Sequence, residues 1–244
     1  SGSSGSLFGA SGSANFLYVT LQKLKDLEKE VILFTGQKGM NPSFPEVGPW
    51  QLYGIETNRY AHDLAQMVVW IGYLQWIRHH DLGTWDDPVL KAMSNIECRD
   101  AILDMSGPEP KEPEWPAADF IVGNPPFLGG KKLRTELGDA YVDVMFDVYD
   151  GRVPAEGDLC CYWFEKARVA IEQGRTQRTG LLATQGIRGG ANRRVLESIK
   201  QTGDIANRHG LRRRRRAVLA QEHLLVGDRQ RAIELRARDA VCRD

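Results

Sequence analysis

A short apolar segment, DFIVG at residues 119–123, is interrupted at once by Asn124-Pro125-Pro126-Phe127. Proline fixes its own φ angle and has no backbone N–H, and it also restricts the residue before it. Two consecutive prolines therefore cannot continue a strand or a helix. We expect a strand that ends at Gly123 and a rigid loop that begins at Asn124.

Short apolar segments and amphipathic stretches alternate along most of the chain. Leucines recur at three- and four-residue steps from Leu17 to Leu27, which is the spacing of one helix face. The same criteria predict strands at 51–55, 119–123 and 180–184, a strand edge within 96–102, and further helices after Asn58, at 158–172 and at 192–200. Residues 104–117 and the charged segment after Phe127 are expected to be irregular. This order predicts an α/β domain with a mostly parallel sheet flanked by helices.

The helix after Asn58 has a predicted start and a predicted buried face. Asn58 is the type of residue that caps a helix N-terminus. The expected core-facing residues are Ala61, Leu64, Ala65, Val68, Ile71 and Gly72.

Three polar or small-residue features follow expected strands or precede helices. They are the segment Ala10 to Phe16 (ASGSANF), Glu56 at the end of LYGIE, and the loop that begins at Asn124. Ligands of open α/β sheets bind beyond the carboxyl ends of the strands, so these features are expected to share one edge. Small residues before a helix allow close backbone approach to a ligand, and a strand-end carboxylate can accept hydrogen bonds from ribose hydroxyls. An ordinary turn and an exposed loop glutamate are the alternatives for the first two.

The loop at Asn124 carries the most specific chemistry. The side-chain oxygen of Asn124 and the carbonyl oxygen of Pro125 can each accept one N–H of an exocyclic amine. Two such bonds would direct the nitrogen lone pair outward and make the amine a nucleophile without a strong base. Phe127 can stack on the ring that carries the amine. The alternative is a plain Pro-Pro loop edge.

Composition and motif absences exclude several classes of function. The formal net charge is +0, so nucleic acid would have to be bound by a local basic patch or by a further domain. No stretch reaches about 18 apolar residues, the length of a membrane span. The four cysteines lack CxxC spacing, the five histidines are scattered, and no GxSxG is present. We expect a reduced protein with no metal site and no serine nucleophile.

At this point the sequence resembles a known family. NPPF after DFIVG is similar to the catalytic motif of class I S-adenosylmethionine-dependent adenine-N6 DNA methyltransferases of bacterial restriction-modification and phage-defence systems. ASGSANFL resembles their cofactor loop, and the resemblance continues through IETN, CYWFEKA and GLLATQGIRGGANRRVLE, over about residues 8–205. It implies a Rossmann-like fold, S-adenosylmethionine as cofactor, double-stranded DNA with a flipped adenine as substrate, and a bacterial cytoplasmic location. Because an Arg-rich tail stands where the family continues into a strand hairpin, the sheet is expected to be incomplete at its C-terminal edge.

The resemblance also assigns roles to individual residues. The residues expected at the cofactor are Ala10, Gly12, Ala14, Asn15, Phe16, Glu56, Asp100 and Ile102. Glu56 would hold the ribose, and Asp100 would accept the adenine amine of the cofactor. The residues expected at the flipped adenine are Asn124, Pro125, Pro126 and Phe127. The residues expected at DNA phosphates are Lys131, Lys132, Arg134, Arg188, Arg193 and Arg194, for which a solvated loop is the alternative.

The chain departs from the family pattern in the cofactor loop. Phe8-Gly9 stands where the family has Asp-Pro, and Ser11 to Ala14 stands where it has Cys-Gly-Ser-Gly. The missing carboxylate and the added methyl of Ala14 both predict weaker cofactor binding.

Three segments are expected in the domain organisation. Residues 1–6 resemble a linker, 7–205 form the methyltransferase domain, and 206–244 form an Arg-rich tail without convincing β-alternation. The tail is either an out-of-frame end or a basic phosphate-binding segment, and a separate recognition or nuclease domain is the expected partner. Two other functions stay open: a glutamine or RNA-base amino-methyltransferase, and an inactive remnant or scaffold.

Overall fold

The computed structural model describes residues 6–9, 15–40, 45–80, 93–202, 204–206 and 217–221. Over these residues seven strands form one sheet in the order β3-β2-β1-β4-β5-β7-β6, and every neighbouring pair is parallel. The strands are β1 (Ser6–Gly9), β2 (Leu52–Glu56), β3 (Ile96–Cys98), β4 (Phe120–Gly123), β5 (Arg178–Leu182), β6 (Asp204–Ala206) and β7 (Ala217–Gln221). The predicted α/β fold with a mostly parallel sheet is confirmed.

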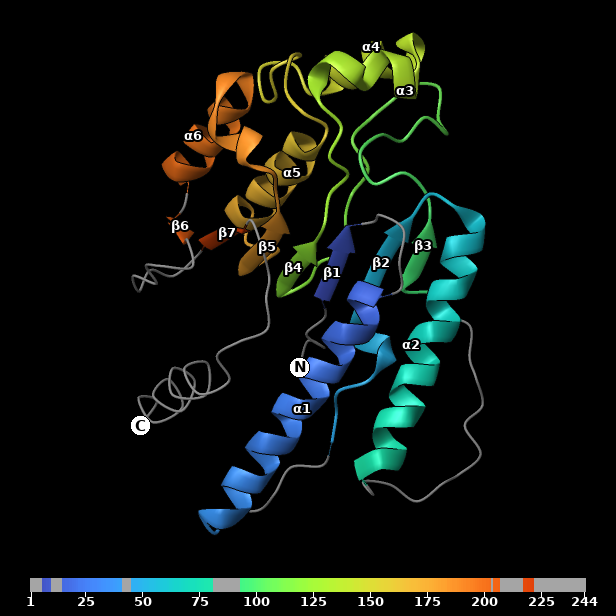
Figure 1. Cartoon of the computed structure of the whole chain (residues 1–244), viewed down its shortest axis with the longest axis vertical. Helices are drawn as coiled ribbons and strands as arrows, with labels where there is room; N and C mark the ends of the chain where they lie inside the picture. The colour runs from blue at the N-terminus through green and yellow to red at the C-terminus, as the bar shows by residue number, and fades with distance from the viewer. Residues whose placement is uncertain are drawn as a thin grey trace.

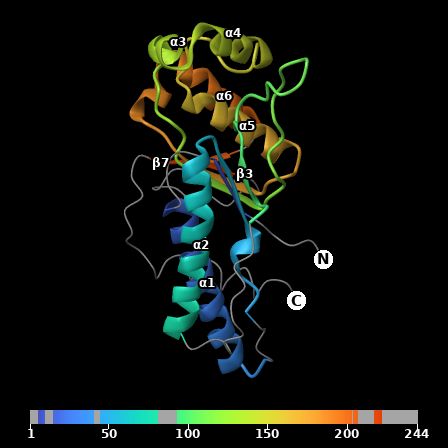
Figure 2. The ribbon, with the colours of Figure 1, turned by 90° about the vertical axis from the view of Figure 1, so that its right-hand side faces the viewer.

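Helices connect the strands and cover the sheet (Figure 1). The α-helices are α1 (Asn15–Gln37), α2 (Arg59–His80), α3 (Leu133–Leu137), α4 (Asp139–Val148), α5 (Cys160–Glu172) and α6 (Arg193–Thr202), with 3-10 turns η1 (Pro49–Gln51), η2 (Gly130–Lys132), η3 (Gln185–Arg188) and η4 (Gly190–Asn192). Figures 1 and 2 both show α3 and α4 beyond one end of the sheet, while the paired α1 and α2 extend past the other end.

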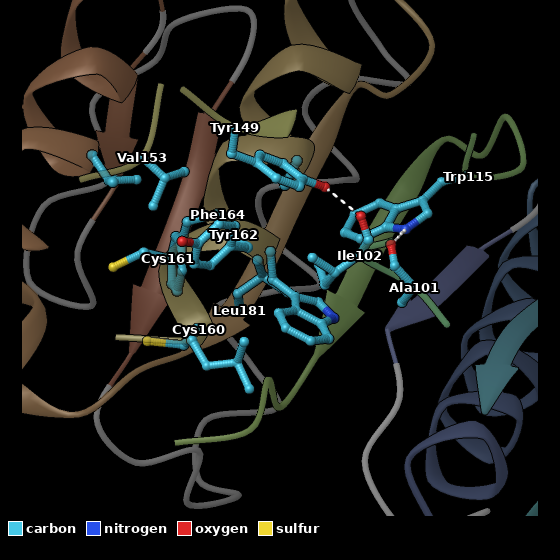
Figure 3. Close-up of a cluster of buried hydrophobic side chains, with 14 of the residues drawn as sticks. Ala101, Ile102, Trp115, Tyr149, Val153, Cys160, Cys161, Tyr162, Phe164 and Leu181 are labelled. Atoms are coloured by element: carbon cyan, nitrogen blue, oxygen red, sulfur yellow. Dashed lines mark hydrogen bonds between the residues drawn. The ribbon is translucent and has the colours of Figure 1, made fainter. Parts of the chain in front are cut away.

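Two clusters of buried side chains form the core. The smaller cluster lies between α1, α2, β2 and β3 and includes Leu21, Leu52 and Val69. The larger cluster joins the segment after β3 to β4, α4, α5, β5 and α6, and Figure 3 shows part of it. The larger cluster includes side chains of α3 and α4, so it packs these two helices against the carboxyl ends of the strands.

The start of α2 is as predicted, but its buried face is only partly so. The side-chain Oδ1 of Asn58 accepts the N–H of Ala61 at 3.0 Å, which is an N-cap bond. The buried residues of α2 are His62, Ala65, Val69, Gly72 and Trp76. Leu64 and Ile71 are exposed, so the expected face was wrong at these positions. Apolar residues lie on both sides of α2, so the sequence does not decide which side is buried. The hydrogen bond of 3.0 Å between His62 Nε2 and the carbonyl of Ile96 fixes the rotation of α2 about its own axis.

The segment after Phe127 is helical, although it was expected to be a charged loop. Residues 130–148 form η2, α3 and α4. Leu133, Val142 and Met145 are fully buried in the larger cluster. Partly buried apolar residues of the same segment, among them Leu137 and Phe146, pack against this cluster as well. The charged residues between them hide the helical spacing of these apolar side chains in the sequence.

The sheet continues beyond β5, where it was expected to be incomplete. β7 lies between β5 and β6 and pairs with both in parallel register. The Arg-rich tail, whose sequence shows no convincing β-alternation, therefore contributes a strand to the sheet. The segment Ala217 to Ala220 (AVLA) is a short unbroken apolar run, which is typical of a strand with a neighbour on each side. Strand β1 also includes Ser6, which had been assigned to the linker.

Candidate functional site

The carboxyl ends of four adjacent strands meet at one edge of the sheet. In the order β3-β2-β1-β4, the last residues are Cys98, Glu56, Gly9 and Gly123. The chain proceeds from β1 toward β2 and β3 on one side and resumes with β4 and β5 on the other. This reversal between β1 and β4 is the position at which open α/β sheets bind ligands.

Glu56 ends β2 at this edge and is partly buried. Its Oε1 atom accepts the backbone N–H of Asn58 at 3.0 Å, and its backbone carbonyl accepts the N–H of Arg99 at 3.1 Å. The second bond continues the β2–β3 pairing by one residue. It places Glu56 on the strand next to the segment that carries Asp100.

Asp100 lies two residues beyond β3, and its carboxylate has three donors. Oδ1 accepts the backbone N–H groups of Ile102 at 2.7 Å and Leu103 at 3.3 Å. Oδ2 accepts the hydroxyl of Tyr141 at 2.7 Å. Burial raises the pKa of Tyr141, and the bond to Asp100 raises it further, so the phenol remains a donor. Tyr141 belongs to α4 and was not anticipated, since no local pattern links residues 41 positions apart.

The residues behind Asp100 are fixed by two buried aromatic side chains (Figure 3). Trp115 Nε1 donates to the carbonyl of Ala101, and the hydroxyl of Tyr149 donates to the carbonyl of Ile102, both at 2.8 Å. Ile102 is fully buried in the larger core cluster. The backbone that follows Asp100 is therefore fixed by hydrogen bonds from the core.

The loop after β4 presents an aromatic ring to solvent. Pro125 is buried and Asn124 is partly buried with its Oδ1 atom inside the protein, whereas Phe127 is 49% exposed. An aromatic side chain that is half exposed on a rigid loop is available for stacking on a planar ligand.

The predicted basic residues lie on two segments at this same end. Lys131 and Lys132 are exposed in η2, and Arg188 and Arg194 are exposed in η3 and α6. Arg134 is different because its guanidinium pairs with two carboxylates, Asp139 at 3.1 Å and Asp143 at 2.7 Å, and these bonds raise its pKa. Arg193 pairs with Glu197 at 3.0 Å.

Part of the expected cofactor loop lies outside the described residues. Ala10, Gly12 and Ala14 belong to that part, and Asn15 is described only as the first backbone position of α1. Phe16 follows in the first turn of α1 and is partly buried.

A pocket of about 820 Å³ opens beside Asp100 and Tyr141. It is large enough for a ligand of nucleoside size. Among the expected site residues only Asp100 lines it, and the other lining residues come mainly from 97–114. Asn124 is not among the residues that line this pocket.

The described residues contain neither a metal-binding cluster nor a membrane-spanning helix. Within the part of the chain that the structure describes, no group of three or more His, Cys, Asp or Glu side chains is placed to hold a metal ion. None of the described helices combines the length and the apolar character that a bilayer crossing requires.

Comparison with known proteins identifies the family. The family model described as "MmeI, DNA-methyltransferase domain" matches residues 6–205. The chain belongs to this family. The match confirms the resemblance to DNA methyltransferases, and it extends over the described strands from β1 to the middle of β6.

Two relatives of this MmeI-family domain are much longer than the chain. DNA methyltransferase A of Bacillus subtilis (strain 168) is 29% identical over 160 residues, which are 64% of this chain and 18% of that protein. The solved structure of the type IIL restriction-modification enzyme MmeI in complex with DNA matches with a TM-score of 0.62 and 20% identity, over 84% of this chain and 28% of that one. The structural match supports the α/β methyltransferase fold. The chain thus spans less than a third of either relative.

Proposed function

We propose that this MmeI-family domain transfers a methyl group from S-adenosylmethionine to the N6 amine of an adenine in double-stranded DNA. The observation that carries the proposal is the meeting of Glu56, Asp100 and the Asn124 loop at the carboxyl ends of adjacent parallel strands. Glu56 at the end of β2 and Asp100 after β3 would accept hydrogen bonds from a nucleoside cofactor, and the loop after β4, on the other side of β1, would accept those of a second amine.

The described acidic residues suit the cofactor chemically. Glu56 would accept hydrogen bonds from the ribose hydroxyls. A carboxylate has about four lone-pair sites, and Asp100 uses three of them, so one remains for the adenine amine of the cofactor. Ile102 is buried behind Asp100, and we assign it to the core rather than to the cofactor surface. The segment Ala10 to Phe16, between β1 and the body of α1, would hold the methionine portion.

The Asn124 loop would hold the target base. The bound cofactor supplies an electrophilic methyl group on its sulfonium. The Asn124 side-chain oxygen is buried in this structure and would have to turn toward the base. It and the Pro125 carbonyl would then each accept one proton of the target amine, which directs the nitrogen lone pair toward that methyl. Pro126 keeps the loop rigid, and Phe127 would stack on the flipped adenine. The protein's contribution is orientation of the nitrogen rather than removal of a proton.

DNA phosphates would be contacted by the exposed basic segments. We assign this role first to Lys131, Lys132, Arg188 and Arg194. The charges of Arg134 and Arg193 are shared with neighbouring carboxylates, so we expect smaller contributions from them. Residues 7–205 would carry the methyl transfer, and recognition of the target sequence would need a separate domain, as would any nuclease activity.

The test uses the 244-residue chain with cofactor that carries a radiolabelled methyl group. We expect label in double-stranded DNA, recovered as N6-methyladenine after digestion. Asn124→Ala should lower the turnover number by about 100-fold or more with cofactor affinity nearly unchanged, whereas Glu56→Ala should weaken cofactor binding by about tenfold or more. Radiolabelled methyl groups recovered in RNA, or on a glutamine side chain of a protein, would contradict the proposal that DNA is the substrate. If no binding is detected at a cofactor concentration of about 1 mM, the chain is an inactive remnant.

A further inference from the structure

Two segments that are distant in the sequence are held by one carboxylate, that of Asp158. Its Oδ1 atom accepts the backbone N–H of Gly130 at 3.1 Å, just after the Phe127 loop. Its Oδ2 atom accepts the side-chain amide of Asn192 at 2.8 Å, in the loop between β5 and α6. We refer to Asp158 and Asn192 together as the Asp158–Asn192 pair.

The pair forms a closed set of hydrogen bonds. The backbone N–H of Asp158 donates to Asn192 Oδ1 at 2.8 Å, and Asn192 Nδ2 also donates to the carbonyl of Gly186 at 3.1 Å. Asn192 is only 8% exposed. Both carboxylate oxygens of Asp158 have a donor, and both ends of the Asn192 amide are used. The residue types therefore fit this position better than their near-isosteres would, since an amide at 158 offers only one acceptor.

The pair fixes the base-binding loop directly after Phe127. The backbone N–H of Leu159 donates to the carbonyl of Leu128 at 2.8 Å, so Leu128 and Gly130 are both bonded to the segment 158–159. Phe127 thus enters solvent from a loop whose next residues cannot shift without breaking these bonds.

The pair also lies between the two basic segments. Lys131 and Lys132 follow Gly130 directly, whereas Arg188 and Arg194 flank Asn192 along the chain. All four are exposed. The hydrogen bonds through Asp158 therefore set the distance between the two groups of cations and between each group and Phe127.

We propose that Asp158 and Asn192 are positioning residues that hold the base-binding loop in register with the two DNA-contacting segments. The inference rests on the proposed function. The pair would act on DNA binding and on turnover, and it would leave cofactor binding unchanged because it touches neither Glu56 nor Asp100.

The test exchanges the two side chains in the full chain. Asn192→Asp places two carboxylates against each other, and Asp158→Asn places two amide NH2 groups against each other. The double variant Asp158→Asn with Asn192→Asp restores the bonds within the pair and to Gly130, but it replaces the bond to Gly186 by a contact between two acceptor oxygens. We expect each single variant to lower kcat/KM for DNA by about 10- to 100-fold with cofactor affinity within about twofold, and the double variant to recover most of that loss.

A matched pair supplies the control. Gln177 Nε2 donates to Asp119 Oδ1 at 2.9 Å, a similar amide–carboxylate contact at the amino ends of β4 and β5. Asp119→Asn and Gln177→Glu should leave kcat/KM for DNA within about twofold of the wild type. Single Asp158 or Asn192 variants that match these controls would overturn the proposal. So would variants that lose cofactor binding and thermal stability in parallel, without recovery in the double variant.

Hydrogen exchange separates this proposal from the proposed function. Asp158→Asn should raise exchange in residues 128–132 and 186–194 together, whether or not the chain methylates DNA. A wild-type chain that transfers no methyl group would contradict the proposed function alone. Unchanged exchange in either segment would contradict the positioning role.

Discussion

Gly130 has no space for a side chain. A Cβ atom at this position would lie 2.3 Å from the backbone carbonyl oxygen of Glu156, which is far inside van der Waals contact. The neighbouring Gly129 differs, since its Cβ would lie 3.6 Å from Asp158 Oδ1 and its φ of −67° suits any residue. Two adjacent glycines thus have different reasons to be present, and only the first is required by close backbone approach.

Gly130→Ala should therefore destabilise the protein, and Gly129→Ala should not. The clash is with backbone rather than with a flexible side chain, so the loop must move, and we expect a loss of about 1–3 kcal/mol in the free energy of unfolding. Urea unfolding of both variants measures it. Equal urea midpoints of unfolding for the two variants would show that the backbone of 154–157 can move away from residue 130 without loss of stability.

The candidate site residues could be predicted from the sequence more readily than the residues that bond to them. Asn124, Phe127 and Glu56 are recognisable because each directly follows or ends an apolar segment, and the parallel sheet puts those segments' ends together. Tyr141 and Asn192 could not be predicted, since each meets its carboxylate only after helices fold across the sheet edge. The spacing of residues along the sequence does not predict such long-range contacts.

At the scale of elements, α1 and α2 approach each other closely at one glycine. A Cβ at Gly72 of α2 would lie 2.3 Å from the ring of Tyr18 in α1. Tyr18 is itself held by a hydrogen bond from Gln22 at 2.6 Å. The glycine lets the ring fill the space between the helices, as small residues do where helix axes come close.

Gly72→Ala should push the two helices apart. We expect a loss of about 1–3 kcal/mol in stability, because overpacking exceeds the helix-propensity gain of about 1 kcal/mol from replacing glycine. Gly36→Ala in α1 is the control, since no atom lies within 4 Å of its Cβ position and only the propensity term acts. Thermal unfolding followed by circular dichroism compares them. A Gly72→Ala protein as stable as the Gly36→Ala protein would show that Tyr18 can turn away without cost.

Helices and strands could be predicted where the spacing of apolar residues fits only one type of element or only one buried face. The strands near 52, 120 and 178 were found because apolar runs bounded by Gly or Pro are distinctive. The face of α2 was ambiguous because apolar residues lie on two sides of it, and the helices after Phe127 were obscured by their charge. β7 is five residues long and follows an arginine run, which had suggested an irregular tail.

At the scale of the whole molecule, an ion cluster around the buried Lys166 joins the Pro-rich segment before β4 to α5. Lys166 of α5 is 4% exposed and donates to Glu112 Oε1 at 3.2 Å and to the carbonyl of Pro113 at 2.6 Å. Arg152 pairs with the other oxygen of Glu112 at 2.6 Å. Burial lowers the pKa of Lys166 to about 8, although Glu112 opposes the shift. The protein thus carries a buried ammonium group at neutral pH and bears its desolvation cost.

This cluster predicts a pH dependence of stability. Between about pH 8 and 10.5 the unfolded chain keeps the Lys166 proton that the folded chain has released, so stability rises with pH in this window. The full shift is worth at most about 3 kcal/mol. We expect the difference in unfolding free energy between wild type and Lys166→Met to shift in favour of wild type by up to this amount from pH 7.5 to 10. Urea titrations at both pH values measure it, with the exposed Lys111→Met as control. A difference that does not change with pH would contradict a lowered pKa.

The position of β1 has a consequence for how the chain acquires its fold during synthesis. β1 is the first described strand in the sequence but lies in the interior of the sheet, between β2, which begins at Leu52, and β4, which begins at Phe120. On a chain that emerges from the ribosome, one edge of β1 can pair as soon as β2 has emerged. The other edge stays open until β4, which begins more than a hundred residues after the end of β1. Throughout that interval the nascent chain offers an open strand edge to other nascent chains and to chaperones. The protein's exposure to misassembly is therefore set by the speed of translation between these two strands.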